Sequence, residues 1–163
     1  MTLFQKVYVS KRSLRFSKLC LGDILSACAQ RNPEDGLTGL LLSETHYFFQ
    51  VLEGPTLPVA AAYARIAADP RHTDCHVLLE REIPNRMFSD WSMAFREIDT
   101  LDPDEHCVEL TRATVVNDLL GGADDTLRRL ITQFLDRRRA PNRGRVEWLE
   151  RGPSGDGPQT AVA

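Results

Sequence analysis

The sequence predicts an α+β fold, because strand-like and helix-like segments alternate along residues 1–98. Several short runs are either alternating or almost continuously apolar, which is typical of strands. Two longer stretches repeat apolar residues at helical spacing. The order of the segments, β-α-β-β-α-β-β, describes a ferredoxin-like five-stranded sheet with two helices packed on one of its faces.

A polar loop separates the first predicted strand from the first predicted helix. Phe4 to Ser10 alternates and is rich in β-forming residues. Ser17 is a suitable cap for a helix from Lys18 to about Arg31. Pro33 cannot continue a helix, so we expect the chain to turn at Asp35-Gly36. The face of this helix that should be buried consists of Leu21, Ile24, Leu25, Cys28 and Asn32.

The next two strands form a predicted hairpin. Leu37 to Ser43 is a nearly continuous apolar run, as expected for a strand that is covered on both faces. Glu44-Thr45 is short enough for a hairpin turn into the strand from His46 to Glu53. Gly54-Pro55 should end that strand, because proline cannot donate to a sheet hydrogen bond.

A second helix and two more strands complete the predicted sheet. Pro58 suits the first turn of a helix that reaches about Ala68. Cys75 to Leu79 predicts a short strand, and Trp91 to Ile98 predicts the last one. The buried stripe of the second helix should consist of Val59, Ala62, Tyr63 and Ile66.

Residues 99–139 predict a helical extension to this domain. Pro103 begins a polar helical segment, and Asp124 can cap a last helix that reaches about Arg138. Its apolar stripe consists of Leu127, Leu130, Ile131, Phe134 and Leu135. We expect this stripe to pack on the sheet face that the first two helices leave uncovered. Residues 140–163 are rich in Gly, Pro, Arg and Ser and predict a disordered tail.

The composition of the 163 residues narrows the class of protein. A formal net charge of −3 gives no electrostatic case for direct binding to nucleic acid. The four cysteines form no C-x-x-C pair, and the histidines have no ligand spacing, so we expect neither a disulfide framework nor a metal site. No run approaches the ~20 apolar residues of a membrane span. The expectation is a cytoplasmic protein without membrane contact.

Three neutral polar side chains stand out in segments that should be buried. Gln50 lies inside the apolar run from Tyr47 to Leu52, where an unpaired amide would cost a few kcal/mol. Tyr8 lies in the middle of the first strand, and Asn32 closes the first helix. A backbone carbonyl or a buried water could satisfy a lone Gln. The set of three suits a planar ligand with several hydrogen-bonding edges better than it suits acid–base hydrolysis.

Five segments carry a resemblance to a known family: VYVS, RNPEDGLTGLLL, FFQVLEG, IAADPRH and RMFSDWSMAF. In this order they resemble the BLUF family, blue-light sensors that hold FAD non-covalently. The resemblance covers about residues 3–98. The separations match as well, with 18 residues from Asn32 to Gln50 and 41 from Gln50 to Trp91.

The resemblance implies a role for each matching residue. Tyr8 would donate an electron and a proton to the excited flavin, and Gln50 would be the amide that switches its hydrogen bonds. Asn32 would hold the pyrimidine edge of the ring, and Ile24 and Ile66 would sandwich it. The other cofactor-binding residues implied are Cys28, Leu41, Phe48, Arg65, Asp69, Arg71 and His72. The signal would be relayed by the strand that carries Trp91, Ser92 and Met93.

This chain departs from the family at Cys28, near the implied flavin, and at Arg31, next to the implied binding residue Asn32. Cys28 stands where many relatives carry a serine, and a thiol is the weaker hydrogen-bond partner. Arg31 stands where Asn or His is often seen.

The function that the resemblance implies is a blue-light photoreceptor that binds FAD, with FMN or riboflavin as possible substitutes. Its signalling state would be red-shifted and would return thermally to the dark state. Without a recognisable catalytic output domain, the chain looks like the short type that signals by altering a protein contact. The partner would be a cyclic-di-GMP enzyme, a transcriptional regulator or a second copy in a homo-oligomer. We expect the contact surface at the final helix and the uncovered part of the sheet.

Two other classes of function stay open at this point. One is an enzyme on the same fold, with ground-state flavin redox chemistry or acylphosphatase-like hydrolysis. The loop Lys11-Arg12-Ser13 is not the Gly-rich phosphate cradle that hydrolysis would require. The other is a colourless interaction domain, against which the presence of Tyr8, Asn32 and Gln50 argues.

Overall fold

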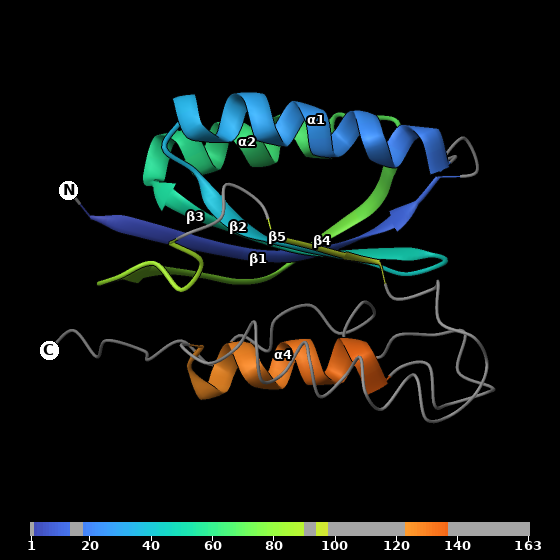
Figure 1. Cartoon of the computed structure of the whole chain (residues 1–163). Helices are drawn as coiled ribbons and strands as arrows, with labels where there is room; N and C mark the ends of the chain where they lie inside the picture. The colour runs from blue at the N-terminus through green and yellow to red at the C-terminus, as the bar shows by residue number, and fades with distance from the viewer. Residues whose placement is uncertain (1, 14–17, 90–93, 98–122, 137–163) are drawn as a thin grey trace, which may run out of the picture.

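A computed structural model describes residues 2–13, 18–89, 94–97 and 123–136 of the chain. The strands form one sheet in the order β4-β1-β3-β2-β5, in which the first four are antiparallel neighbours and β5 runs parallel to β2. Helices α1 and α2 lie on one face of the sheet and α4 lies on the other, which confirms the α+β class (Figure 1). The elements are β1 (Leu3–Arg12), α1 (Lys18–Glu34), β2 (Thr38–Ser43), β3 (Tyr47–Pro55), α2 (Thr56–Ala67), β4 (His72–Ile83), β5 (Ala94–Glu97) and α4 (Asp125–Asp136).

The register of the three central strands brings the notable polar residues together. Tyr8 on β1 lies opposite Gln50 on β3, and Gln50 in turn lies opposite Leu41 on β2. Side chains directly opposite each other in a sheet point to the same face. These three side chains therefore share a face, and their sequence neighbours point to the other one.

The end of α1 corrects the prediction made from Pro33. The helix continues through Pro33 to Glu34 and then closes with two hydrogen bonds. The Leu37 amide donates to the Asn32 carbonyl at 2.7 Å, and the Gly36 amide donates to the Pro33 carbonyl at 3.2 Å. Gly36 has φ +64°, as this helix ending requires. Pro33 cannot donate to the carbonyl four residues earlier, and its ring crowds that carbonyl, but its place one residue before the helix end limits the disruption to the last turn.

Strand β4 is also longer than the sequence predicts. Only Cys75 to Leu79 was expected, whereas the strand runs from His72 to Ile83 and pairs with β1 along almost its whole length. Two register irregularities interrupt this pairing, and Asp74 has φ 47°. Such irregularities break the alternation of buried and exposed positions, so periodicity detects only the middle of the strand.

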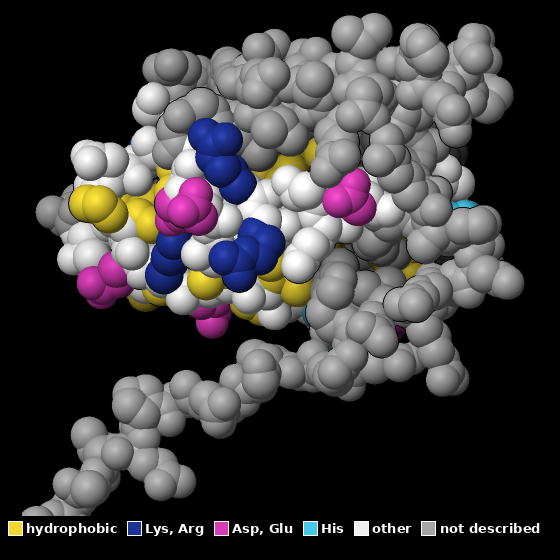
Figure 2. Space-filling view, turned by 90° about the horizontal axis from the view of Figure 1, so that it is seen from below, with side chains coloured by type: hydrophobic (Ala, Val, Ile, Leu, Met, Phe, Trp, Pro, Cys, Tyr) yellow, Lys and Arg dark blue, Asp and Glu magenta, His cyan; other side chains and the backbone are white. Residues whose placement is uncertain are grey.

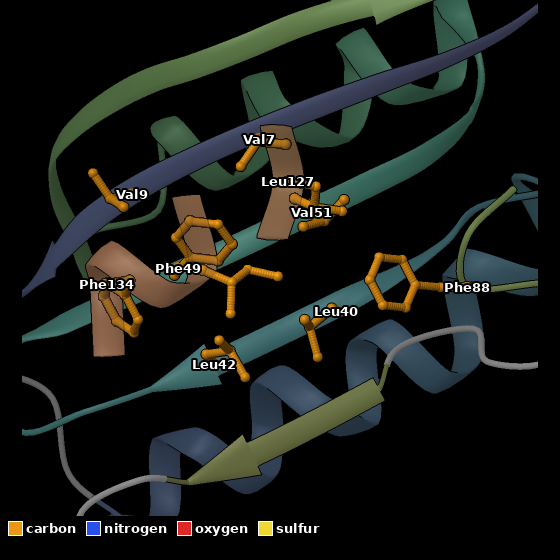
Figure 3. Close-up of a cluster of buried hydrophobic side chains, with 10 residues drawn as sticks. Val7, Val9, Leu40, Leu42, Phe49, Val51, Phe88, Leu127 and Phe134 are labelled. Carbon is orange, nitrogen blue, oxygen red and sulfur yellow. The ribbon is translucent and has the colours of Figure 1, made fainter. Parts of the chain in front are cut away.

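Helix α4 covers the second face of the sheet, as its apolar stripe predicts. Leu127, Ile131 and Phe134 are buried, and the rings of Phe134 and Phe49 lie 5.3 Å apart. The Asp124 carboxylate accepts a hydrogen bond from the Leu127 amide at 2.9 Å, which confirms the predicted cap. Figure 3 shows this core between the sheet and α4, together with Phe88. The core consists of Val7, Val9, Leu40, Leu42, Phe49, Val51, Phe88, Leu127, Ile131 and Phe134.

Several predicted segments lie outside the described residues. These are the helix cap at Ser17, the first residues of the last predicted strand, the helical segments over 99–122 and the tail over 140–163.

On the side of the molecule that carries α4, the described surface has mixed charge. Figure 2 shows Lys or Arg side chains next to Asp or Glu side chains, with apolar side chains between them. Within the described ranges, no helix has the length and apolar character needed to cross a membrane.

Candidate functional site

A cavity of about 180 Å³ lies between the sheet and the two helices α1 and α2. Nine of the residues that line it were predicted from the sequence as cofactor-binding or photochemical. These nine are Ile24, Cys28, Asn32, Gln50, Arg65, Ile66, Asp69, Arg71 and His72. Residues more than forty positions apart in the sequence thus meet in one cavity, because the β-α-β-β-α order returns both helices to the same face of the sheet.

Gln50 contributes a hydrogen-bonded amide to the floor of this cavity. Its side chain is only 3% exposed, and its Oε1 accepts a hydrogen bond from the Tyr8 hydroxyl. The oxygen of the Gln50 amide accepts from Tyr8, and the NH₂ group of the same amide can donate a hydrogen bond. The pair therefore links a buried phenol to the cavity through a group that offers both a donor and an acceptor.

Tyr8 lies behind Gln50 and does not itself line the cavity. Its side chain is fully buried, and the ring of Tyr63 packs edge-on against it with 4.9 Å between the ring centroids. Burial raises the pKa of Tyr8 well above its ordinary value, with smaller contributions from Cys75, Cys28 and Tyr63. The phenol is therefore neutral at physiological pH and keeps its proton available for transfer.

The two helices supply the walls of the cavity. Ile24 and Cys28 come from α1 and Ile66 comes from α2, so branched apolar side chains face the space from both helices. Asn32 is buried in the last turn of α1 and adds an amide. Burial raises the pKa of the Cys28 thiol, which is therefore neutral as well.

Leu41 and Phe48 support the site without lining it. Both are buried with Ile24 in one apolar cluster on β2, β3 and α1. Phe48 also contacts the His72 ring, with 4.8 Å between centroids. These two residues hold the wall of the cavity in place, and the structure does not place them at the cavity surface itself.

Charged and titratable groups gather where α2 meets β4. The Arg71 guanidinium donates to both carboxylate oxygens of Asp69, with Nε at 2.9 and 3.0 Å, and this hydrogen bonding lowers the pKa of Asp69. His72 Nδ1 lies 2.8 Å from the Ser10 hydroxyl. Burial lowers the pKa of His72 to about 4, so the imidazole is neutral at physiological pH. Arg65 on α2 pairs at 3.0 Å with Asp35, the residue that follows α1.

Four lining residues were missed by the sequence reasoning: Ala27, Arg31, Leu52 and Ala62. Helical and strand periodicity could have found them. Ala27 and Arg31 lie three residues after Ile24 and Cys28 on α1, and Ala62 lies four residues before Ile66 on α2. Leu52 lies two residues after Gln50 on the same strand face.

The donor set of this cavity fits a flat heterocycle. Two amides provide neutral donors and acceptors, apolar side chains face the space from both helices, and three arginines contribute cations. Among the described residues, no group of three or more His, Cys, Asp or Glu side chains could hold a metal ion. The predicted relay residues Trp91, Ser92 and Met93 lie outside the described residues.

Comparison with known proteins identifies a sequence family and a relative that match this chain. The sequence model of the family described as "BLUF: Sensors of blue-light using FAD" matches residues 3–94. The photoactivated adenylate cyclase subunit beta of Euglena longa is 37% identical over 81 residues, which are 50% of this chain and 9% of that protein. The chain therefore corresponds to a small part of that curated relative.

Two solved structures share the fold along most of this chain. The dark-state structure of BlrB, described as a BLUF protein, has a TM-score of 0.62 at 27% identity, covering 82% of this chain and 97% of that chain. Klebsiella pneumoniae BlrP1 with FMN and cyclic diGMP has a TM-score of 0.64 at 28% identity, covering 82% of this chain and 34% of that chain.

Proposed function

The chain belongs to the BLUF family of blue-light sensors using FAD, and from this premise we propose that it is a photoreceptor whose light reaction runs through Tyr8 and Gln50. The observation that carries the proposal is the hydrogen bond from the Tyr8 hydroxyl to the Gln50 amide at the floor of the cavity. It connects a neutral, buried electron donor to the space between α1 and α2.

The cavity fits the flavin that the family uses. Asn32 and Gln50 would hydrogen-bond the polar edge of the ring, and Ile24 and Ile66 would lie against its two faces. Arg65, Asp69, Arg71 and His72 would surround the ribityl chain and phosphate. Cys28 would lie near the ring, where its thiol is the weaker hydrogen-bond partner. FMN and riboflavin share the ring and should also bind.

A bound flavin would supply absorption of blue light and an excited state that accepts an electron. Tyr8 would give an electron and then its phenolic proton to the flavin and would recover both before the red-shifted state is complete, so that the flavin is not reduced in that state. The Gln50 amide would rearrange and exchange its donor and acceptor ends without movement of the backbone. Such a local change in hydrogen bonding can be amplified by an element that has two arrangements.

The output would reach the surface through the strand at the sheet edge. β5 is the fifth strand of the ferredoxin-like sheet, and the proposed relay residues Trp91, Ser92 and Met93 directly precede it. From there the signal would pass to the segment after Ile98 and to α4. Residues 1–98 would be the sensor domain, and residues 99–139 would be its helical extension.

We propose that the output is a changed contact with another protein and not a catalytic reaction of this chain. The Euglena relative is named as an adenylate cyclase subunit, and BlrP1 was solved with cyclic diGMP. A cyclic-di-GMP enzyme or a transcriptional regulator in the cytoplasm would be a partner of matching type, as would a second copy of this chain.

The absorption spectrum of the purified protein tests the proposal. A flavin spectrum that moves to the red after blue light and recovers in the dark is expected.

Tyr8→Phe should keep the flavin and lose the shift, since the ring remains but the phenolic proton does not, and Gln50→Leu should behave likewise. A red shift that persists in Tyr8→Phe would remove Tyr8 as the donor. Bleaching would indicate flavin reduction and favour an enzyme, and a colourless protein that takes up no FAD would indicate an interaction domain.

A further inference from the structure

Three arginines line the cavity, and they differ in what neutralises them. Arg71 is held by the carboxylate of Asp69, and Arg65 is paired with Asp35 at 3.0 Å. Arg31 lines the same cavity, but it forms no ion pair with any residue of the described part of the chain. Its positive charge is therefore not balanced by a neighbouring carboxylate.

The other titratable groups around the cavity do not offset this charge. The hydrogen bonds from Arg71 lower the pKa of Asp69, so that pair stays ionised and neutral as a unit. Burial keeps His72 and Cys28 uncharged at physiological pH. Among the described residues that line the cavity, Arg31 is therefore the one cation without an ion pair, and an anion is the ligand group that would complement it.

Arg31 could serve only to interact with the helix dipole, since it lies in the last turn of α1. Its position argues for more than that, because it lies three residues after Cys28 and directly before Asn32, both of which line the cavity. A guanidinium also presents a planar set of donors that matches phosphate oxygens. A neutral ring system would offer this group only neutral acceptors, whereas a phosphorylated flavin would also offer an anion.

We propose that Arg31 is a specificity-determining residue that makes the cavity prefer phosphorylated flavins, FMN and FAD, over riboflavin. The proposal rests on the proposed function for the assumption that the ligand is a flavin. Asp35 has the opposite effect, because it occupies Arg65 and withholds a second cation from the phosphate. The preference is therefore set by two residues that flank the end of α1.

FMN and riboflavin form a matched pair of probes, since they differ only in the phosphate. Dissociation constants of both are measured on the purified, flavin-free full chain by quenching of flavin fluorescence. Arg31→Gln should weaken FMN binding by about two- to fivefold, as expected for an exposed charge pair, and leave riboflavin binding unchanged. The FMN preference should also fall as ionic strength rises, because exposed charges are screened by salt.

Two further variants separate this role from a structural one. Asp35→Asn should increase the FMN preference, because it frees Arg65 while keeping the size of the side chain. Arg129→Gln removes the same charge from an exposed position on α4, across the sheet from the cavity, and should leave both constants unchanged. A general loss of folding cannot make the FMN preference fall in Arg31→Gln and rise in Asp35→Asn.

Equal weakening of both flavins in Arg31→Gln would overturn the proposal, as would unchanged FMN binding or a preference that Asp35→Asn fails to increase. A chain that binds neither flavin would contradict this inference and the proposed function together. The two are otherwise independent. A red shift with no phosphate preference refutes only the role of Arg31, whereas loss of phosphate preference in Arg31→Gln without any red shift refutes only the photochemistry.

Discussion

Tyr8 and His72 stay neutral for the same physical reason, although one is an acid and the other is a base. Burial disfavours the charged form of each, which raises the pKa of Tyr8 and lowers that of His72 to about 4. Each neutral group has one polar partner: Tyr8 donates to Gln50, and His72 Nδ1 meets the Ser10 hydroxyl. The cavity therefore presents hydrogen-bonding groups without charge beside Gln50, and its charges lie at the arginines.

His72 should make the stability of the flavin-free chain depend on pH. Its pKa is about 4 in the folded protein and about 6.5 when unfolded, so only the unfolded chain takes up a proton between these values. The contribution is complete above pH ~6.5 and is lost as the pH falls toward ~4, by up to about 3 kcal/mol. Urea unfolding at several pH values measures it, with His72→Asn as the reference that lacks the titrating group. If the stability of the two proteins depended on pH in the same way, the lowered pKa of His72 would be contradicted.

Glu53 forms hydrogen bonds with residues that are distant in the sequence. The fully buried carboxylate accepts hydrogen bonds from Gln5 Nε2 on β1 at 2.8 Å and from the amides of Met87 and Phe88 at 2.9 and 3.1 Å. Gln5 accepts in turn from Arg81 on β4, and Arg81 pairs with Asp124 at the start of α4. A polar row thus crosses the sheet from the loop after β4 to the cap of α4.

Glu53→Gln should destabilise the chain by about 2 kcal/mol at neutral pH. An amide of the same shape places an NH₂ group where the carboxylate accepted an N–H, so a buried donor loses its partner. Burial raises the pKa of Glu53, so the folded native chain takes up this proton at a higher pH than the unfolded chain does, and the difference in stability should grow as the pH falls through that raised value. Urea unfolding and hydrogen exchange at Met87 and Phe88 measure the effect. A variant as stable as the native chain, with unchanged exchange, would show that the row is dispensable.

The packing of α4 can be tested separately from the cavity, because the two lie on opposite faces of the sheet (Figure 1). Ile131 is fully buried against the sheet, so Ile131→Ala should cost about 2–5 kcal/mol. Gln133→Ala changes an exposed position two residues away and should stay within about 0.5 kcal/mol. Flavin affinity should be unchanged in both variants. A loss of flavin binding in Ile131→Ala at temperatures where the chain remains folded would show that the two faces are coupled.

The order of elements was predicted from the sequence because burial leaves a periodic pattern, whereas the nine lining residues were predicted mainly from the resemblance to the BLUF family. Prediction from the sequence failed where a local hydrogen-bonding arrangement overrides a propensity. Pro33 remains in α1 because Gly36 and Leu37 satisfy the last carbonyls, and β4 extends past its periodic middle because β1 pairs with it. Arg31 was missed as a lining residue although it lies three residues after Cys28, because an exposed arginine in the last turn of a helix usually interacts with solvent and the helix dipole.

Within the described residues, the molecule consists of two apolar layers on a single sheet, and the cavity lies in the layer under α1 and α2. The layer under α4 is a closed core of ten buried side chains, whereas the layer under α1 and α2 is divided into two smaller clusters. Close packing is the normal state of a protein interior, and a planar ligand would restore it on the cavity side. The stability of the whole chain should therefore be linked to the flavin.

Flavin removal should lower the melting temperature by an amount that mass action sets. At a free FMN concentration of 100 times the dissociation constant, binding to the folded state alone adds about 2.7 kcal/mol. For a chain of this size, that corresponds to a shift of roughly 5–10 °C. Differential scanning calorimetry across a series of FMN concentrations measures it, and Asn32→Ala should show a smaller shift at the same concentration, since the cavity loses an amide. A melting temperature that does not change with FMN would mean that the ligand binds the unfolded chain equally well or not at all, and the cavity would then not be its site.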